Sequence, residues 1–145
     1  SFRLRNGSAG AGRQRGGWGI AYDYRMLWPG QFTIALDRDK YVPEGLFGGN
    51  DAQGSGLVVG PGTDTEAVFT RTSGVGVAAG TILSHRTAGG GGYGNPLERD
   101  PQAVLDDVLD EFITIEHARE SYGVVIDPNS FDVDVTATAK LRQTS

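Results

Sequence analysis

The alternation of apolar and polar residues predicts β-structure in the first part of the chain. Side chains from Trp18 to Leu27 alternate with a period of two, and aromatic or β-branched residues occupy one side, which is typical of a strand. A turn signal, Trp28-Pro29-Gly30, follows at once. The run 31–36 (QFTIAL) then predicts the return strand of a hairpin. Further short strands are expected at 66–71 and 80–86.

Three segments between these strands predict loops. Residues 7–17 (GSAGAGRQRGG) are small and basic, and residues 37–50 carry Pro43 and several glycines. Residues 51–66 are rich in Gly, Ser, Asp and Thr, which are turn-forming residues. We therefore expect long connections between the strands, and no strand within 51–66.

The pattern changes after the glycine run at 89–94. Asp100 is suited to cap a helix that begins at Pro101, and apolar residues at 104, 105, 108 and 109 form a helical stripe. Thr114 and Gly123 mark the start and end of a second helix. A short strand is possible at 124–126, and a third short helix at 134–141. Asp106, Asp107, Asp110 and Glu111 are expected to form a solvated helix face.

These elements predict an α+β fold. It consists of a mainly antiparallel β body over about residues 1–87 with long glycine-rich loops, followed by a short α-helical C-terminal tail. Within the 145 residues, we expect a β-rich part over 1–94 and a helical tail over 95–145. The two acidic helices of the tail are expected to pack antiparallel to each other or on a sheet.

Composition and charge narrow the function classes. No apolar run approaches the roughly 18 residues of a membrane span, and the chain has no cysteine, which fits a cytoplasmic protein. Residues 1–40 hold seven Arg or Lys against three acids, whereas residues 95–145 hold eleven acids against four bases. The net charge of −5 and the lack of a basic helix argue against nucleic-acid binding. The start at Ser1 without a methionine suggests a fragment or a processed piece.

The glycine runs only partly match nucleotide-binding motifs. Gly7 and Gly12 have the spacing of a phosphate loop, but Arg13-Gln14 stands where that motif has Lys and a hydroxyl. Gly89, Gly91 and Gly94 satisfy G-x-G-x-x-G, but Asn95-Pro96 separates them from the helix that the motif requires. Both matches are weak. Neither His85 nor His117 has a metal-ligand spacing, so no metal site is expected and the catalytic residues are unknown.

Read together, three blocks resemble the hydantoinase B/oxoprolinase family. They are 8–17 (SAGAGRQRGG), 45–49 (GLFGG) and 87–101 (TAGGGGYGNPLERDP), the last continuing through Val104, Asp107 and Ala118-Arg119 to 122–125 (YGVV). The blocks follow the family's order over nearly the whole chain. Ala9, Ala88 and Asn95 depart from the usual Gly, Pro and Asp, which are mild changes for residues that shape the backbone.

The resemblance implies that the chain is the C-terminal fragment of a hydantoinase B-like subunit of an ATP-dependent cyclic-amide hydrolase, which opens a hydantoin or 5-oxoproline ring by hydrolysing a C–N bond. ATP would phosphorylate the amide oxygen before water attacks. The family's metal ligands lie in a part that this chain lacks, and its ATP and Mg belong to a hydantoinase A-like partner subunit. The isolated fragment is then inactive, and its partners are the rest of its own subunit and that ATP-binding subunit.

The candidate ligand- or interface-lining residues come from the two longer glycine blocks. They are Gly10, Gly12, Arg13, Arg15, Gly16, Gly17, Gly89, Gly90, Gly91, Gly92 and Tyr93. We expect these loops to come close together, with exposed amides and the two arginines available to anions. The competing interpretation is structural, with the arginines paired to acids of the tail. Two alternatives for the whole chain also stay open: a piece of a related ATP-dependent ketone carboxylase, and a non-catalytic assembly module that docks on a partner subunit.

Overall fold

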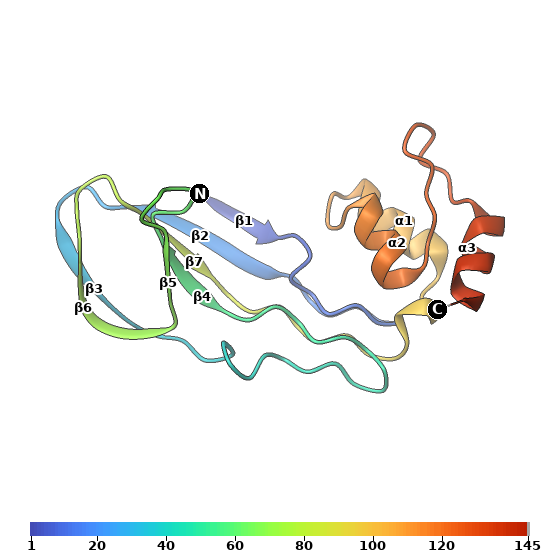
Figure 1. Cartoon of the computed structure of the whole chain (residues 1–145), viewed down its shortest axis with the longest axis horizontal. Coiled ribbons are helices and arrows are strands. Elements are labelled where there is room, and N and C mark those ends of the chain that lie inside the picture. Colours follow the sequence, from blue (N-terminus) through green and yellow to red (C-terminus); the bar gives the residue numbers. More distant parts are fainter. Residues whose placement is uncertain (145) are drawn as a thin grey trace.

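A computed structural model describes residues 1–144 of the chain. The strands gather at one end of the molecule and the helices at the other (Figure 1). Between the two ends run extended segments without regular secondary structure, which include the glycine-rich blocks. The α+β class, with antiparallel strands first and helices near the C-terminus, is confirmed.

Seven strands form two antiparallel sheets. The larger sheet has the order β1-β2-β7-β4-β5, and the smaller sheet pairs β3 with β6. The strands are β1 (Phe2–Arg5), β2 (Gly19–Arg25), β3 (Gly30–Ala35), β4 (Gly56–Val59), β5 (Ala67–Phe69), β6 (Arg71–Val77) and β7 (Ile82–Arg86). The central strand β7 pairs with β2 on one side and with β4 on the other.

The predicted hairpin between β2 and β3 is wrong. β2 pairs with β7 and β3 pairs with β6, so two long chain segments run antiparallel through both sheets. The turn signal at Trp28-Pro29 marks a bend in this ribbon, not a chain reversal. At the bend, backbone hydrogen bonds join this segment to the segment that runs beside it. The Met26 amide donates to the Thr81 carbonyl at 2.9 Å, and the Gly80 amide donates to the Met26 carbonyl at 2.7 Å.

The prediction that 51–66 is all loop is also wrong, because β4 lies within it. Its residues Gly56, Leu57 and Val58 are buried between β7 and β5. The apolar run 57–59 is only three residues long. The glycine and polar residues on both sides of it are typical of a loop, so the sequence did not indicate a strand. The expected strand at 66–71 is divided between β5 and the start of β6, and the rest of β6 was not predicted because it contains two glycines.

The helices begin and end where capping chemistry predicts. Helix α1 (Pro101–Leu109) starts after Asp100, whose carboxylate accepts from the Gln102 amide. Helix α2 (Ile115–Tyr122) starts after Thr114 and ends at Gly123, which has a φ of 62°, the left-handed conformation that glycine adopts easily. Helix α3 (Val135–Gln143) follows Asp134. A short 3₁₀ helix, η1 (Pro96–Glu98), precedes α1, and 124–126 contributes only the isolated bridge of Ile126 to Val133.

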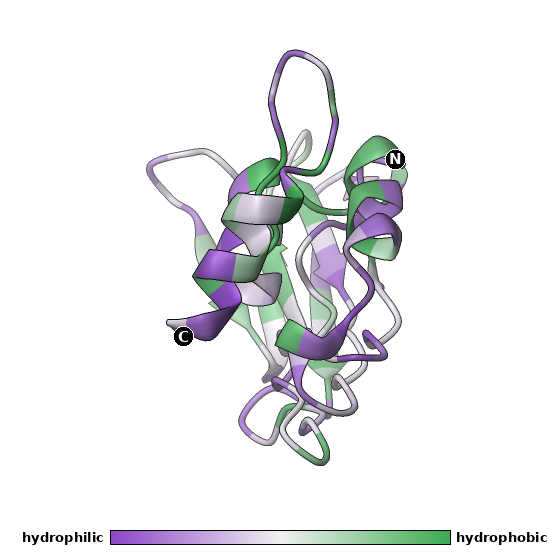
Figure 2. Cartoon of the chain, turned by 90° about the vertical axis from the view of Figure 1, so that its right-hand side faces the viewer, coloured by the Kyte–Doolittle hydropathy of each residue, from purple (hydrophilic) through white to green (hydrophobic). Residues whose placement is uncertain are grey.

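The main hydrophobic core lies at the helical end. It contains Val104, Leu105, Val108, Ile113, Ala118, Tyr122, Val124, Ile126 and, from the first glycine block, Ala11. Hydrophilic and hydrophobic residues alternate along the helices that face the viewer in Figure 2, as expected for helices that bury one side. Ala11 and the adjoining Trp18 attach the glycine loops to this core. Among the described helices, none is long and apolar enough to cross a membrane.

Candidate functional site

The glycine blocks lie side by side and are joined by backbone hydrogen bonds. The Gly10 amide donates to the Gly90 carbonyl at 2.9 Å, and the Gly90 amide donates to the Gly17 carbonyl at 2.8 Å. The third block, 45–49, joins the same assembly, because the Leu46 amide donates to the Gly92 carbonyl at 2.8 Å. The expectation that the loops at 8–17 and 87–96 come together is therefore confirmed, and 45–49 is a third member that the hypothesis did not include.

This assembly requires glycine because backbone packs directly on backbone. An added Cβ at Gly16 would overlap the carbonyl oxygen of Gly90, and one at Gly92 would overlap the carbonyl oxygen of Ala11. The same kind of overlap with a backbone atom would arise at Gly10, Gly12, Gly45, Gly49, Gly89 and Gly91. Two candidate residues differ: nothing lies within 4 Å of a Cβ at Gly17, and the nearest atom at Gly90 is 3.0 Å away.

The amides of the second loop do not serve as an anion cradle. Between 89 and 94, the amides of Gly89, Gly90, Gly92, Tyr93 and Gly94 all donate to backbone carbonyls of the other segments. An anion or a nucleotide phosphate would have to displace these hydrogen bonds. The loop also leads into a 3₁₀ helix of three residues instead of the long helix that a dinucleotide loop requires. For these five amides, the expected role in holding anions is wrong.

Arg15 binds an acid of the helical tail. Its Nε lies 3.0 Å from both carboxylate oxygens of Asp107, and Arg99 donates to the same carboxylate at 2.9 Å. The Asp107 side chain is only 7% exposed. The Arg15 guanidinium also lies over the Trp18 ring, 4.9 Å from its centroid, a favourable cation–π geometry. The structural interpretation therefore holds for Arg15.

Asp107 and Arg99 are the two members of this cluster that sequence reasoning missed. Asp107 is buried, whereas it was expected on a solvated helix face. The sequence indicated the burial of Asp107 in part, since Asp107 lies close to the apolar stripe of its helix. Arg99 gave no signal of its own, because a single arginine before a helix has many possible partners.

Arg13 and Tyr93 lie on the outside of the loop assembly. The Arg13 side chain is exposed and makes no hydrogen bond or ion pair within residues 1–144. The Tyr93 ring packs in a tilted arrangement against Phe47, with the ring centroids 5.1 Å apart, and Phe47 is 79% exposed. With Leu46, these residues form an exposed tip on the packed loops, which we call the loop tip (Arg13, Leu46, Phe47 and Tyr93). Of the predicted site residues, Arg13 and Tyr93 thus present side chains on the outside of the loops, where they can contact another molecule.

The described residues do not fit a catalytic metal. No group of three or more His, Asp or Glu side chains within 1–144 has the arrangement of a metal site. His85 lies in β7 within the larger sheet, whereas His117 lies in α2 at the helical end.

His117 gives the helical end a pH dependence. Burial lowers the pKa of this imidazole, and Glu120 opposes that shift more weakly. In the unfolded chain a histidine titrates near its ordinary value of about 6.5, so the unfolded state binds a proton first as pH falls. The contribution of His117 to stability is thus present above that pH and is lost below it.

We expect the thermal midpoint of the wild type to fall further between about pH 7.5 and about pH 5.5 than that of the variant His117→Gln, because most carboxylates titrate below this window. Thermal melts at the two pH values measure the difference. Equal shifts for both proteins would contradict the assignment.

Comparison with known proteins assigns the chain to a protein family. The family model for hydantoinase B/oxoprolinase matches residues 1–96. The chain belongs to this family. It is 40% identical over 144 residues to an uncharacterised protein of Methanocaldococcus jannaschii, covering 97% of this chain and 25% of that relative. It is 30% identical over 142 residues to the caprolactamase subunit beta of Pseudomonas jessenii, covering 94% and 24%.

A solved structure of a family member shares the fold described here. The crystal structure of the ATP-dependent caprolactamase from Pseudomonas jessenii superposes with a TM-score of 0.81 at 26% identity, over 99% of this chain and 25% of that one. The chain thus spans about a quarter of the length of these relatives. The match includes both the β part and the helical tail.

Proposed function

We propose that the chain is the C-terminal segment of a hydantoinase B-like subunit, in an enzyme that uses ATP to hydrolyse a cyclic amide. The observation that carries this proposal is the match along the whole chain to an ATP-dependent caprolactamase, in sequence and in fold. Family membership, shown over residues 1–96, supports the same assignment. The catalytic and ATP-binding groups would lie in the remainder of the subunit and in a hydantoinase A-like partner.

This chain itself would contribute structure: it would hold its loops and helices in fixed positions within the complex. The packed glycine loops form a stiff connection, because their hydrogen bonds are satisfied internally and their segments interlock. The Arg15–Asp107–Arg99 cluster fixes the helices to one side of this connection. The loop tip on the outside would then be held in a constant position against the rest of the complex. Arg13 supplies an unpaired guanidinium there, a good donor for a carboxylate or a phosphate.

The full-length subunit, purified together with its ATP-binding partner, tests the proposal. We expect phosphate release from ATP to depend on a cyclic amide, in a panel of hydantoin, 5-oxoproline and caprolactam, with ring-opened product formed in parallel. Acetone with bicarbonate is the control substrate pair. Activity with that pair alone would show a ketone carboxylase, and a complex that assembles without any activity of these kinds would favour the assembly-module alternative.

A further inference from the structure

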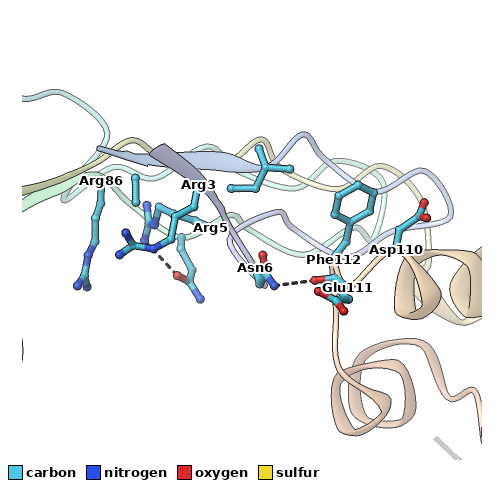
Figure 3. A pocket seen from close by; sticks show the side chains of 10 residues that line it. Arg3, Arg5, Asn6, Arg86, Asp110, Glu111 and Phe112 are labelled. Carbon is cyan, nitrogen blue, oxygen red and sulfur yellow. Dashed lines mark hydrogen bonds between the residues drawn. The ribbon is translucent and has the colours of Figure 1, made fainter. Parts of the chain in front are cut away.

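A cavity separate from the glycine loops lies between the larger sheet and the turn after α1. Its volume is about 670 Å³. Arg3, Arg5 and Arg86 line it on the sheet side, whereas Asp110, Glu111 and Phe112 line it on the helical side. Figure 3 shows the three arginines at one end of the row of side chains and the two acids at the other, with Asn6 between them. No ion pair links the two ends among the described residues.

The sheet wall carries uncompensated positive charge. Strand register aligns Arg3 and Arg86 on opposite sides of Ala21, on one face of the sheet. Arg3 is neutralised by Asp23, but the guanidinium of Arg86 has no hydrogen bond or ion pair within residues 1–144.

Arg5 holds this wall in place. Its guanidinium donates to the carbonyls of Gly54 and Thr87 and to the Gln53 side chain. Burial and, less strongly, the like charge of Arg86 lower the pKa of Arg5, since both effects disfavour its charged form. An anion beside Arg5 and Arg86 would relieve this repulsion.

The helical wall carries negative charge in a locally unfavourable place. Asp110 and Glu111 follow the C-terminus of α1, where the helix dipole disfavours anions. Glu111 also adopts a left-handed φ of 59°, which is uncommon for a residue other than glycine. The Asn6 side chain donates to the Glu111 carbonyl at 2.6 Å and so fixes this turn beside β1. The cavity thus has a cationic end and an anionic end, both anchored.

We propose that this cavity binds an amino-acid zwitterion, with its carboxylate at Arg86 and Arg5 and its ammonium group toward Asp110 and Glu111. An anion with a second negative charge at its far end would be repelled by the acids, and a simple amine would gain nothing from the arginines. The unpaired guanidinium of Arg86 and the opposite charges at the two ends of one cavity carry the assignment.

The link between this ligand and the reaction rests on the proposed function. When water hydrolyses a lactam, the C–N bond breaks, the carbonyl carbon gains the hydroxyl of water and the nitrogen gains its proton. The product carries a carboxylate at one end and an amine at the other. The product of lactam hydrolysis therefore has the charge pattern of this cavity, whereas the product of hydantoin hydrolysis carries a neutral carbamoyl group in place of the amine.

Binding of three matched probes to the full-length subunit tests the site without turnover. The probes are 6-aminohexanoate, hexanoate and hexylamine, and ligand-observed NMR titration measures each dissociation constant. We expect 6-aminohexanoate to bind more tightly than hexanoate, and hexylamine not to bind. Arg86→Gln should weaken 6-aminohexanoate at least tenfold, and Glu111→Gln should reduce it to the affinity of hexanoate.

Arg25→Gln provides the matched control, because Arg25 lies on the same strand pair as Arg86 but outside the cavity. It should leave all three affinities unchanged, and unfolding curves of each variant verify that the fold is intact. The proposal is overturned if neither carboxylate binds, if hexanoate binds as tightly as 6-aminohexanoate, or if Arg86→Gln changes nothing. Binding by a subunit that shows no cyclic-amide hydrolysis would overturn the proposed function and leave the site standing.

Discussion

Replacing Asp107 with asparagine should lower the free energy of unfolding by about 3–5 kcal/mol, the usual loss when one partner of a buried ion pair is removed. Asparagine has the same shape but no charge, so Arg15 and Arg99 would face each other without the carboxylate that both of them bind. The side chain of Arg99 is only 12% exposed, so water cannot readily replace the lost partner. Urea unfolding of the full-length subunit or of the chain measures the change.

The neighbouring residue offers a matched control for this prediction. Asp106 lies one position earlier in α1, is exposed, and accepts only a hydrogen bond from the Gln102 side chain at 3.1 Å. Asp106→Asn should change stability by less than about 0.5 kcal/mol, as most surface substitutions do. Similar losses for both variants would show that helix charge, and not the buried cluster, governs the stability of this end.

Gly16→Ala should destabilise the protein by at least about 3 kcal/mol, at the upper end of the range for overpacked sites. The new Cβ would overlap the Gly90 carbonyl. That carbonyl is itself held by the Gly10 amide, so neither segment can move without breaking backbone hydrogen bonds. We expect the variant to unfold at lower denaturant or to accumulate as insoluble protein.

Gly17→Ala tests whether the close approach of backbone to backbone at Gly16 causes the loss of stability. Gly17 is adjacent in the same loop, and nothing lies within 4 Å of an added Cβ there. Its change in stability should stay within about 1 kcal/mol, and alanine at a compatible position can even stabilise by restricting the unfolded chain. If both variants lose stability equally, the loop needs glycine for flexibility and the packing explanation fails.

The helical end was largely predictable from the sequence because its signals are local. Asp100, Thr114 and Gly123 act through hydrogen bonds to residues two to five positions away, so each cap and its partner lie within one short stretch of sequence. Asp107 shows the limit of this approach. At 100° per residue it lies only about 60° from Val104 on the helical wheel, whereas Asp106 lies about 160° away. The wheel thus places Asp107 near the buried side but cannot name the arginines that neutralise it.

The sheet was harder to predict because its pairings are not local. A turn signal at Pro29 has the same appearance whether the chain reverses or bends, and only the partner strand decides between the two. The partner strands β6 and β7 lie at least 36 residues away from β3 and β2 in sequence. The close packing of the glycine loops was likewise invisible at the level of single blocks. The prediction that the glycine loops come close together depended on the order of the blocks along the chain, which resembles the pattern of a known family.

The position of β7 between β2 and β4 sets the order in which the sheet can assemble. β1 and β2 are close in sequence and pair with each other, as do β4 and β5. Neither pair touches the other until β7, residues 82–86, joins them. Until residues 82–86 have been synthesised, the larger sheet can therefore exist only as these two separate strand pairs. β7 then completes the larger sheet, and before it does so both of the edges that it will cover remain open to other chains.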